Sequence, residues 1–374
     1  IITPTEEHLY INPHKLTSII SKRLDEDGIK VSLYDHFEKN VSNLPSGARV
    51  LYDPNKMNAR VVKALRDDVI KVEAPSVVEA LKAVKPENEI KHITSAHIKD
   101  GVAMVNFLHW LQWAYATEEL TELSVADKLL EFRKQQEGFL CESFGAISAF
   151  GENSALCHYE PTIETNARIG DGFLLMDTGG QYVGGTTDIT RTIAMGQIKD
   201  KQACVDYTLV LKGHIAVSRA IFPEGTHGSQ LDTLARVFMW QNQIDFGHGT
   251  GHGVGFNLNV HEGPQRISKK DNGSEIKAGY VTTDEPGIYR EGKWGVRIEN
   301  VVVCKEVGQS EFGRFLGFYP ITMCPIDKRP IVVEMLTQEE KEWLNDYHSI
   351  VYETLSPLVS EDVREWLKGA TEAI

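Results

Sequence analysis

The chain has 374 residues, of which 41% are hydrophobic and 25% are charged, as in typical soluble globular proteins. This composition argues against a disordered chain, a collagen and a coiled coil. The 39 Lys and Arg residues against 53 Asp and Glu residues give a formal net charge of -14, so we expect no nucleic acid and no acidic membrane surface as a partner, because both would repel the protein.

Cysteine usage and hydropathy bear on the compartment. The 5 cysteines show no Cys-x-x-Cys spacing, which favours a reducing compartment over a disulfide framework. The most hydrophobic long stretch, residues 101–116, is interrupted by Asn106, His109 and Gln112, and no stretch reaches the ~20 apolar residues of a membrane helix. We therefore expect a cytoplasmic protein without a membrane segment. The chain opens without Met or a signal-like segment, and we expect it to be part of a longer polypeptide.

Residues 1–84 carry short apolar runs broken by Pro, Gly and Asn, a pattern that predicts a small α/β unit. Asp53 is an expected N-cap with Pro54 at the first helical position, which predicts a helix near residues 54–68. Strands ending near Leu51 and Val72 would flank this helix. So few elements make an incomplete sheet, so we expect the beginning of this unit to be missing.

From Lys85 the pattern changes to two long amphipathic helices, predicted at 86–117 and 124–137, the second opened by Ser124 with Asp127 as a weak capping box. A strand-rich block near 140–195 follows, then helices near 200–222 and 229–241, then a second strand-rich block near 245–305. Two successive halves of helices and strands suggest a duplicated α+β domain over residues 85–374, with its site between the halves and a C-terminal helical tail.

The first chemically unusual segment, residues 174–192, places Asp177 and Asp188 on a glycine-punctuated hairpin. The plain interpretation is that each is a turn residue beside glycine. However, Asp177 follows an apolar strand and Asp188 stands among β-branched residues, so both carboxylates are expected to face a partly buried space. Two such anions need a cation.

The second segment, residues 246–255, alternates histidine and glycine and brings His248 and His252 into one tight place. It lacks the Gly-Lys-Ser/Thr ending of a P-loop and the spacing of a dinucleotide fingerprint, so a phosphate site is disfavoured. A structural role for either histidine remains the alternative. A third histidine, His261, follows shortly afterwards.

Two further apolar, strand-like runs each contain a glutamate, Glu285 in one and Glu299 in the other. Strand alternation would place Arg297 and Glu299 on the same face, so a plain buried Arg–Glu pair is the alternative interpretation for the second run.

Together these segments provide four carboxylates and one imidazole, namely Asp177, Asp188, His252, Glu285 and Glu299. Two divalent cations would balance the charge of the four carboxylates, and oxygen ligands with one imidazole suit Mn²⁺ or related ions better than a thiolate site would. The sequence therefore predicts a dinuclear site. Such a site can hold a bridging hydroxide, polarise a carbonyl and stabilise a tetrahedral oxyanion, which is the chemistry of amide hydrolysis.

These motifs resemble those of the pita-bread metallopeptidases, the group of methionine aminopeptidase, prolidase and aminopeptidase P. The likeness covers most of residues 86–374 and is closest to the three-domain aminopeptidase P subfamily. It rests on His158-Tyr159-Glu160-Pro161-Thr162, Gly185-Thr186-Thr187-Asp188, His248-Gly249-Thr250-Gly251-His252-Gly253-Val254-Gly255, Val260-His261-Glu262-Gly263-Pro264 and Arg297-Ile298-Glu299-Asn300-Val301. The resemblance implies an α+β pita-bread domain at 85–374 with an internal pseudo-two-fold, preceded by a partial creatinase-like α/β domain at 1–84.

The resemblance also implies roles for individual residues. Asp177 would bind one ion with both oxygens, Asp188 and Glu299 would bridge, and His252 and Glu285 would each complete one site, with Glu285 also carrying the proton. The remaining implied residues surround the substrate: His158, His248 and His261 line the pocket, and Tyr289 and Arg297 support it. The implied metals are two divalent ions, with Mn²⁺ favoured over Zn²⁺ and Co²⁺.

The implied activity is that of a metallo-aminopeptidase that removes an N-terminal residue when proline follows it. We further expect a homodimer, weakly supported by Trp240 and Phe246 as exposed aromatics near the His-Gly segment. Two alternatives stay open: a prolidase restricted to Xaa-Pro dipeptides, and a non-catalytic pita-bread module that binds peptides. The second alternative, and creatinase-like hydrolysis without metal, both predict lost metal ligands, and none of the five is lost.

Overall fold

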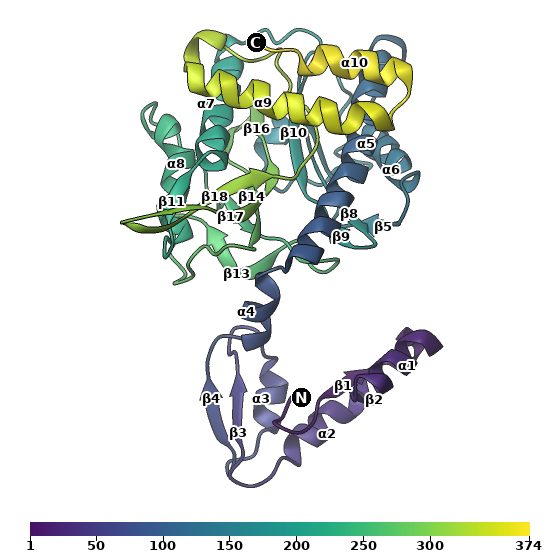
Figure 1. The fold of residues 1–374 in the computed structure, drawn as a ribbon. Helices are drawn as coiled ribbons and strands as arrows, with labels where there is room; N and C mark the ends of the chain where they lie inside the picture. Colours follow the sequence, from purple (N-terminus) through teal and green to yellow (C-terminus); the bar gives the residue numbers. More distant parts are fainter. The chain divides into compact units, whose positions relative to one another are not determined.

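The computed structural model describes residues 1–374 and divides them into two compact units, Ile1–Glu79 and Ala80–Ile374 (Figure 1). The helix α4 (Val77–Ala83) runs across the division. No helix is both long enough and apolar enough to pass through a bilayer.

The N-terminal unit contains two pairs of short parallel strands. β1 (His8–Ile11) pairs with β2 (Lys30–Leu33), and β3 (Arg49–Tyr52) pairs with β4 (Ile70–Glu73). The helices are α1 (Ser18–Glu26), α2 (Phe37–Ser42) and α3 (Ala59–Ala64). A small apolar cluster of Val41, Tyr52, Leu65 and Val69 holds the unit together.

The helix predicted at residues 54–68 is shorter than expected, and its predicted cap is wrong. Asn58 caps α3, its side chain accepting the Arg60 N–H. The Asp53 carboxylate instead accepts the amides of Asn55 and Ser76, so Asp53 holds a turn in front of the helix. An Asx residue can cap a helix or close a turn, and the choice depends on contacts distant in sequence.

The larger unit opens with α5 (Glu87–Thr117) and α6 (Glu122–Lys134). The second helix begins two residues before the predicted start because Thr121 is its cap, and Ser124 is the partner within the capping box. The Ser124 hydroxyl accepts the Thr121 N–H at 2.9 Å, while the Thr121 hydroxyl accepts the Ser124 N–H at 3.2 Å.

The first group of strands forms two small antiparallel sheets. Their orders are β10-β7-β6 and β5-β8-β9. The strands are β5 (Phe139–Glu142), β6 (Ile147–Phe150), β7 (Gly172–Thr178), β8 (Gly180–Tyr182), β9 (Gly185–Thr186) and β10 (Ile189–Met195). The predicted strand-rich block is thus interrupted between β6 and β7 by a segment that begins with a 3-10 helix, η3 (Gly151–Ala155), and contains His158.

The second half repeats the order of helices followed by strands. Helices α7 (Lys201–Ser218) and α8 (Gly228–Trp240) precede a six-stranded sheet with the order β11-β18-β17-β14-β12-β13 and a separate β15-β16 hairpin. The strands are β11 (Ile221–Pro223), β12 (Gly251–Gly253), β13 (Glu262–Ile267), β14 (Val281–Asp284), β15 (Gly287–Arg290), β16 (Trp294–Arg297), β17 (Asn300–Ser310) and β18 (Gly313–Pro320). Helices α9 (Gln338–Leu355) and α10 (Glu361–Thr371) end the chain.

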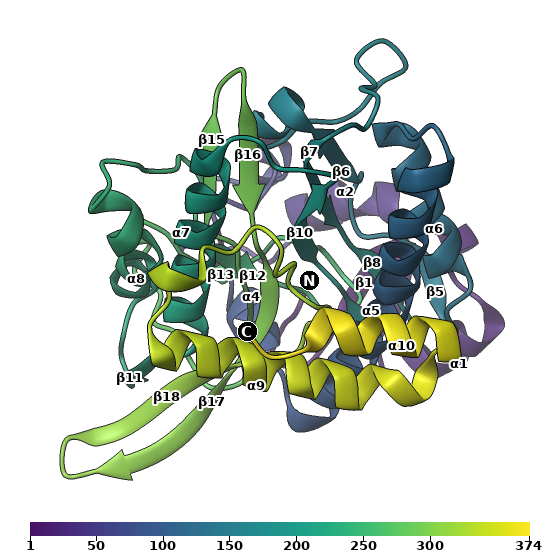
Figure 2. The same cartoon turned by 90° about the horizontal axis from the view of Figure 1, so that it is seen from above.

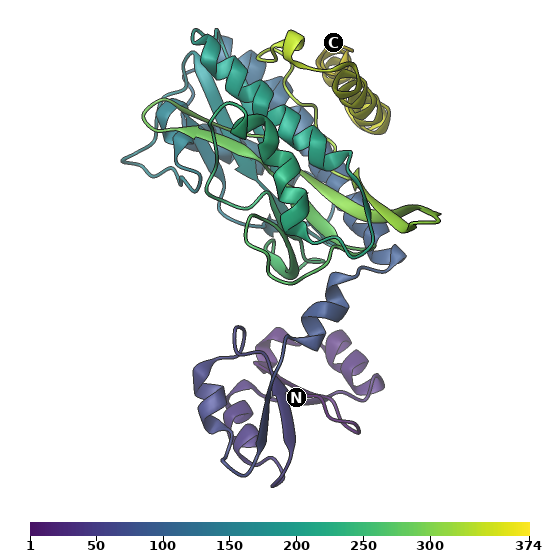
Figure 3. The same cartoon turned by 90° about the vertical axis from the view of Figure 1, so that its left-hand side faces the viewer.

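The strands of the larger unit lie between two helix pairs. Figure 2 shows α5 and α6 on one side of the strands and α7 and α8 on the other, with α9 and α10 across a third side. Figure 3 shows α7 and α8 packed side by side over the strands. The main apolar core joins Val210 of α7, Ile298 between β16 and β17, and Leu344 of α9. A polar site carried by these strands is therefore surrounded by packed apolar layers.

Candidate metal centre and active site

The five predicted metal ligands all lie at or next to strand ends. Asp177 is the penultimate residue of β7, and Asp188 directly precedes β10, the strand that pairs with β7. His252 is the central residue of β12. Glu285 directly follows β14, and Glu299 directly precedes β17, the partner of β14.

The structure brings these five side chains together. Ligand atoms lie within 4.8 Å of one another in three groups: Asp177 with Asp188 and Glu299, His252 with Glu285 and Glu299, and Asp188 with His252 and His261. Glu299 is common to the first two groups, so the five side chains form one continuous cluster. His261, which we predicted as a pocket residue, also reaches the edge of this cluster.

Glycines on both sides of His252 let its strand approach the neighbouring backbone. A Cβ on Gly251 would lie 2.0 Å from the Thr283 carbonyl oxygen, and a Cβ on Gly253 would lie 2.5 Å from the Glu262 carbonyl oxygen. The close approach allows the His252 N–H to donate to the Thr283 hydroxyl at 3.0 Å and the Thr282 hydroxyl to donate to the His252 carbonyl at 2.8 Å. The two glycines that flank His252 are therefore required for steric reasons.

The carboxylates of the cluster crowd together in a largely buried space. Asp177, Asp188 and Glu299 are buried. One oxygen of Asp177, Oδ1, is buried without any hydrogen-bond partner. Buried anionic oxygen without a donor is costly unless a cation binds it, so this donor set fits hard divalent ions.

The pKa values of the cluster reflect this crowding. Burial, followed by the Asp177 charge, raises the pKa of Asp188 to about 6. Burial also raises the pKa of Glu285 to about 7, and burial with three neighbouring carboxylates raises the pKa of Glu299 well above its ordinary value. Burial alone would lower the pKa of His252, but Asp188 at 3.5 Å and Glu285 at 3.7 Å raise it to about 9. A cation in the cluster would favour the ionised carboxylates.

Arg297 does not pair with Glu299, so the alternative interpretation of these two residues as a plain buried ion pair is wrong. β16 ends at Arg297 and β17 begins at Asn300, so the strand alternation on which it relied is broken between them. Arg297 instead donates from Nη2 to Asp177 Oδ2 at 2.6 Å and from Nη1 to the Tyr289 hydroxyl at 2.6 Å. Glu299 accepts from the Thr190 hydroxyl at 2.7 Å.

The three predicted pocket histidines differ in how free their rings are. His158 and His261 are exposed, and the His261 ring lies edge-on to His252 with centroids 4.2 Å apart. Both nitrogens of His248 are engaged, Nδ1 with the Gly249 carbonyl at 2.7 Å and Nε2 with the Tyr289 hydroxyl at 2.8 Å. We assign the proton to Nδ1, because a carbonyl can only accept and Tyr289 has its own proton to give. Burial lowers the pKa of His248 to about 4, consistent with a neutral ring.

One of the two aromatics cited for a dimer surface is not exposed. Trp240 is 44% exposed, but Phe246 is only 3% exposed. The Phe246 ring is covered by the guanidinium of Arg236, whose Cζ lies 3.6 Å from the ring centroid. The prediction that Phe246 is exposed is therefore wrong, because the buried Arg236 covers its ring.

Sequence reasoning missed the buried side chains that form hydrogen bonds next to the proposed ligands and so fix the strands that carry them. Arg191 of β10 donates to the Glu299 carbonyl at 2.6 Å and to Asn300 Oδ1 at 2.8 Å. Asp284, next to Glu285, accepts from the Ser218 hydroxyl at 2.7 Å. Their signal in the sequence is a charged residue inside a run rich in β-branched residues, and this signal does not reveal the partner of the charged residue.

Three family models match successive parts of the chain. The model of metallopeptidase family M24 matches residues 91–306. The chain belongs to metallopeptidase family M24. The C-terminal region model of this family matches residues 314–374, and the creatinase/prolidase N-terminal domain model matches residues 1–89. The predicted α+β pita-bread class and the family resemblance are thereby confirmed.

Curated relatives and solved structures agree with the family. A probable Xaa-Pro aminopeptidase P of Arthroderma gypseum is 39% identical over 392 residues, covering 100% of this chain and 61% of the relative. An X-prolyl aminopeptidase of Caenorhabditis elegans, described as a cytosolic enzyme with a di-nuclear active site, superposes with a TM-score of 0.93 at 34% identity, covering 100% of this chain and 63% of that chain. The prolidase of Pyrococcus furiosus superposes with a TM-score of 0.68 at 27% identity, covering 86% of this chain and 88% of that chain. The chain spans between 58% and 64% of the length of the first curated relatives.

Proposed function

We propose that this M24 chain is the catalytic part of a metallo-aminopeptidase that hydrolyses the N-terminal Xaa-Pro bond of peptides. The observation that carries the proposal is the convergence of four carboxylates and one imidazole in one cluster, together with a buried Asp177 oxygen that has no hydrogen-bond partner. The names of the relatives support the substrate class. A non-catalytic peptide-binding module is disfavoured, because such a module has no need for buried, mutually repelling carboxylates.

The proposed cofactor is a pair of divalent ions, with Mn²⁺ favoured for its preference for oxygen ligands. Asp177 would hold one ion, Asp188 and Glu299 would serve both, and His252 and Glu285 would each complete one site. The presence of Glu299 in two of the three ligand groups supports its shared role. When bound, such ions lower the pKa of a water molecule and polarise a carbonyl oxygen.

The side chains of this chain would supply the remaining steps. Glu285 would accept a proton at its carboxylate and deliver it to the proline nitrogen that leaves. His158 and His261 have exposed imidazoles that would donate to the scissile carbonyl, whereas His248 would act through Tyr289 and Arg297. The carboxylates would attract the protonated amine of a peptide N-terminus, which favours exopeptidase action. The Xaa-Pro bond has no N–H, because proline lacks one, so the site needs no acceptor for it.

The test compares three substrates at equal Mn²⁺: an Xaa-Pro dipeptide, an Xaa-Pro-Xaa tripeptide and an Xaa-Ala-Xaa tripeptide. We expect the proline tripeptide to be cleaved at least as well as the dipeptide. A dipeptidase needs a fixed cation for the free carboxylate just after proline, and Arg297 is occupied by Asp177 and Tyr289. We expect alanine in the second position to lower kcat/KM sharply. Exclusive cleavage of the dipeptide would identify a prolidase, and indifference to proline would refute both names.

We also propose a homodimeric, cytoplasmic enzyme. The partly exposed Trp240 supports the dimer, and the description of the Caenorhabditis elegans relative as cytosolic supports the compartment. Light scattering at micromolar concentration should give twice the mass of one chain. A monomer mass would reject the dimer.

A further inference from the structure

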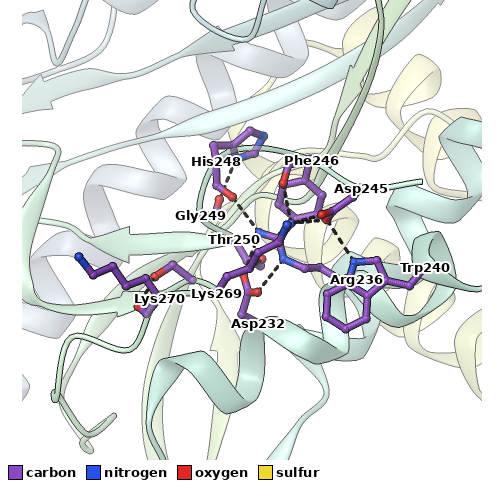
Figure 4. A network of polar contacts seen from close by, with 11 residues as sticks. Asp232, Arg236, Trp240, Asp245, Phe246, His248, Gly249, Thr250, Lys269 and Lys270 are labelled. Atoms are coloured by element: carbon purple, nitrogen blue, oxygen red, sulfur yellow. Dashed lines mark hydrogen bonds and ion pairs between the residues drawn. The ribbon is translucent and has the colours of Figure 1, made fainter. Parts of the chain in front are cut away.

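The segment of residues 246–250, which contains His248, is held by one buried guanidinium on helix α8. Arg236 is 0% exposed. It donates from Nη1 to the Phe246 carbonyl at 2.7 Å and from Nη2 to the His248 carbonyl at 2.8 Å (Figure 4). Nη1 also donates to Asp245 Oδ1 at 2.9 Å. One side chain therefore fixes the backbone on both sides of Gly247.

Asp232, one helical turn before Arg236, completes the arrangement. It accepts from Arg236 Nε at 2.6 Å and from Nη2 at 3.1 Å, and it accepts from the Thr250 hydroxyl at 2.7 Å. The Thr250 carbonyl in turn accepts the Glu285 N–H at 2.7 Å. The Asp232–Arg236 pair thus reaches the whole segment and, through Thr250, the backbone of a proposed metal ligand.

From His248 the contacts continue to a second proposed metal ligand. The His248 ring accepts from the Tyr289 hydroxyl, that hydroxyl accepts from Arg297, and Arg297 donates to Asp177. These contacts run without interruption from α8 to the carboxylate of Asp177. A shift of the His248 backbone would move an acceptor on which Tyr289 and Arg297 depend.

An ion pair within one helix does not by itself require this geometry. An i,i+4 pair needs only the contacts between Asp232 and Arg236. The remaining N–H groups of Arg236 all donate to the segment of residues 246–250 and to Asp245. A lysine has a single nitrogen and could not donate to all of these acceptors in the same geometry. The planar guanidinium, packed on the Phe246 ring, fits this one backbone path.

We infer that Arg236 is a positioning residue for the reaction proposed above, acting through His248; the inference therefore rests on that proposed function. Arg236 touches no substrate and no metal ligand. Its contribution is the placement of the His248 ring against Tyr289 and, through Tyr289, the orientation of Arg297 and Asp177.

The kinetic test is a double-mutant cycle in a preparation that is active before substitution. We expect Arg236→Lys to lower kcat about 10- to 100-fold, since displacing a supporting group by ~1 Å can cost two orders of magnitude, with KM little changed. In a His248→Ala background the same substitution should cost less than about threefold, because its target is gone. Equal costs in both backgrounds would show a role independent of His248 and would overturn the inference.

A matched control separates positioning from general loss of stability. Lys212 on α7 is another buried cation, with Glu340 Oε2 at 2.6 Å and the Met335 carbonyl at 2.9 Å. Lys212→Met should lower Tm and leave kcat unchanged. If it lowers kcat as much as Arg236→Lys does, the effect of Arg236 is ordinary destabilisation and the inference fails.

Hydrogen exchange gives a readout that does not depend on activity. In Arg236→Lys, amides in a peptide covering residues 245–252 should exchange at least tenfold faster, while the same peptide in Lys212→Met should match the parent. Unchanged exchange in Arg236→Lys would overturn the inference. A parent that cleaves no Xaa-Pro bond would refute the proposed function alone, because exchange would still report whether Arg236 holds the segment.

Discussion

Removing the hydroxyl of Tyr289 perturbs the centre of the path between His248 and Asp177 without touching a proposed metal ligand. The hydroxyl lies 2.8 Å from His248 Nε2 and 2.6 Å from Arg297 Nη1. Tyr289→Phe removes both hydrogen bonds and keeps the ring, which packs edge-on against His248 with centroids 5.4 Å apart. The change is therefore confined to one oxygen atom.

The expected magnitude follows from the groups left behind. His248 Nε2 loses its donor, and Arg297 keeps its contacts to Asp177 and Thr190 but loses the acceptor of Nη1. A buried group without its partner costs about 1–3 kcal/mol, so we expect unfolding to become easier by about 2–4 kcal/mol. About half of this cost should appear in the transition state, and each ~1.4 kcal/mol is a tenfold loss of rate. We therefore expect kcat/KM to fall about 5- to 30-fold.

The assay measures kcat/KM on an Xaa-Pro-Xaa peptide, bound metal and Tm in one preparation. Tyr207→Phe is the matched control, because the Tyr207 hydroxyl is also buried and donates to the Asp327 carbonyl at 2.8 Å. Both variants should lose stability and keep metal, but only Tyr289→Phe should lose rate. If the two variants retain equal kcat/KM, the path from His248 to Asp177 does not serve catalysis.

Three further outcomes test other parts of the structure. Glu299→Ala should lose bound metal and activity together, as measured by elemental analysis, and retention of both would exclude a shared ligand role. His261→Ala should lose at least tenfold in kcat while keeping its metal; loss of stoichiometric metal from a folded variant would instead make His261 a ligand. Burial lowers the pKa of His348 from 6.5 to about 3, so on acidification this histidine is protonated in the unfolded chain before it is protonated in the folded chain. The free energy of unfolding should therefore decrease as pH falls below about 6.5, by ~1.4 kcal/mol per pH unit. His348→Gln, whose amide oxygen can accept the Ile326 N–H that His348 accepts at 3.0 Å, should flatten this part of a urea-denaturation pH profile, and an unchanged profile would contradict the assignment.

The candidate metal ligands could be found from the sequence because each stands in a local pattern that a purely structural role rarely produces. Asp177 ends an apolar run. His252 lies between two glycines, and the strand packing leaves no room for a Cβ atom at either of them. Glu285 and Glu299 interrupt runs that are otherwise buried. A charge at such a position needs a partner, so the residue type and its neighbours were enough to predict a cation site.

The partners of the supporting residues could not be found in this way, because they depend on tertiary geometry. Strand alternation suggested Glu299 as an alternative partner of Arg297, but Arg297 pairs with Asp177, 120 residues earlier in the chain. Arg236 lies within the helix predicted near residues 229–241, and no role was predicted for it from the sequence, yet it is fully buried. Its carbonyl acceptors leave no mark in the sequence, since every residue carries a carbonyl. Local signals likewise failed at Asp53, where a turn competed with a helix cap.

The supporting arginines show how the fold can hold acidic ligands together without neutralising them. Arg191 directs most of its donors to backbone carbonyls, including that of Glu299. Arg236 divides its donors between the Phe246 and His248 carbonyls and the carboxylates of Asp232 and Asp245, and neither arginine forms an ion pair with a proposed ligand. Arg297 pairs with one oxygen of Asp177 and leaves the other without a donor. Had these guanidinium groups paired with all four carboxylates, the result would be a buried salt-bridge network with little charge left for a cation. Rigid backbones combined with uncompensated carboxylates instead produce a preformed site in which divalent ions can supply the missing positive charge.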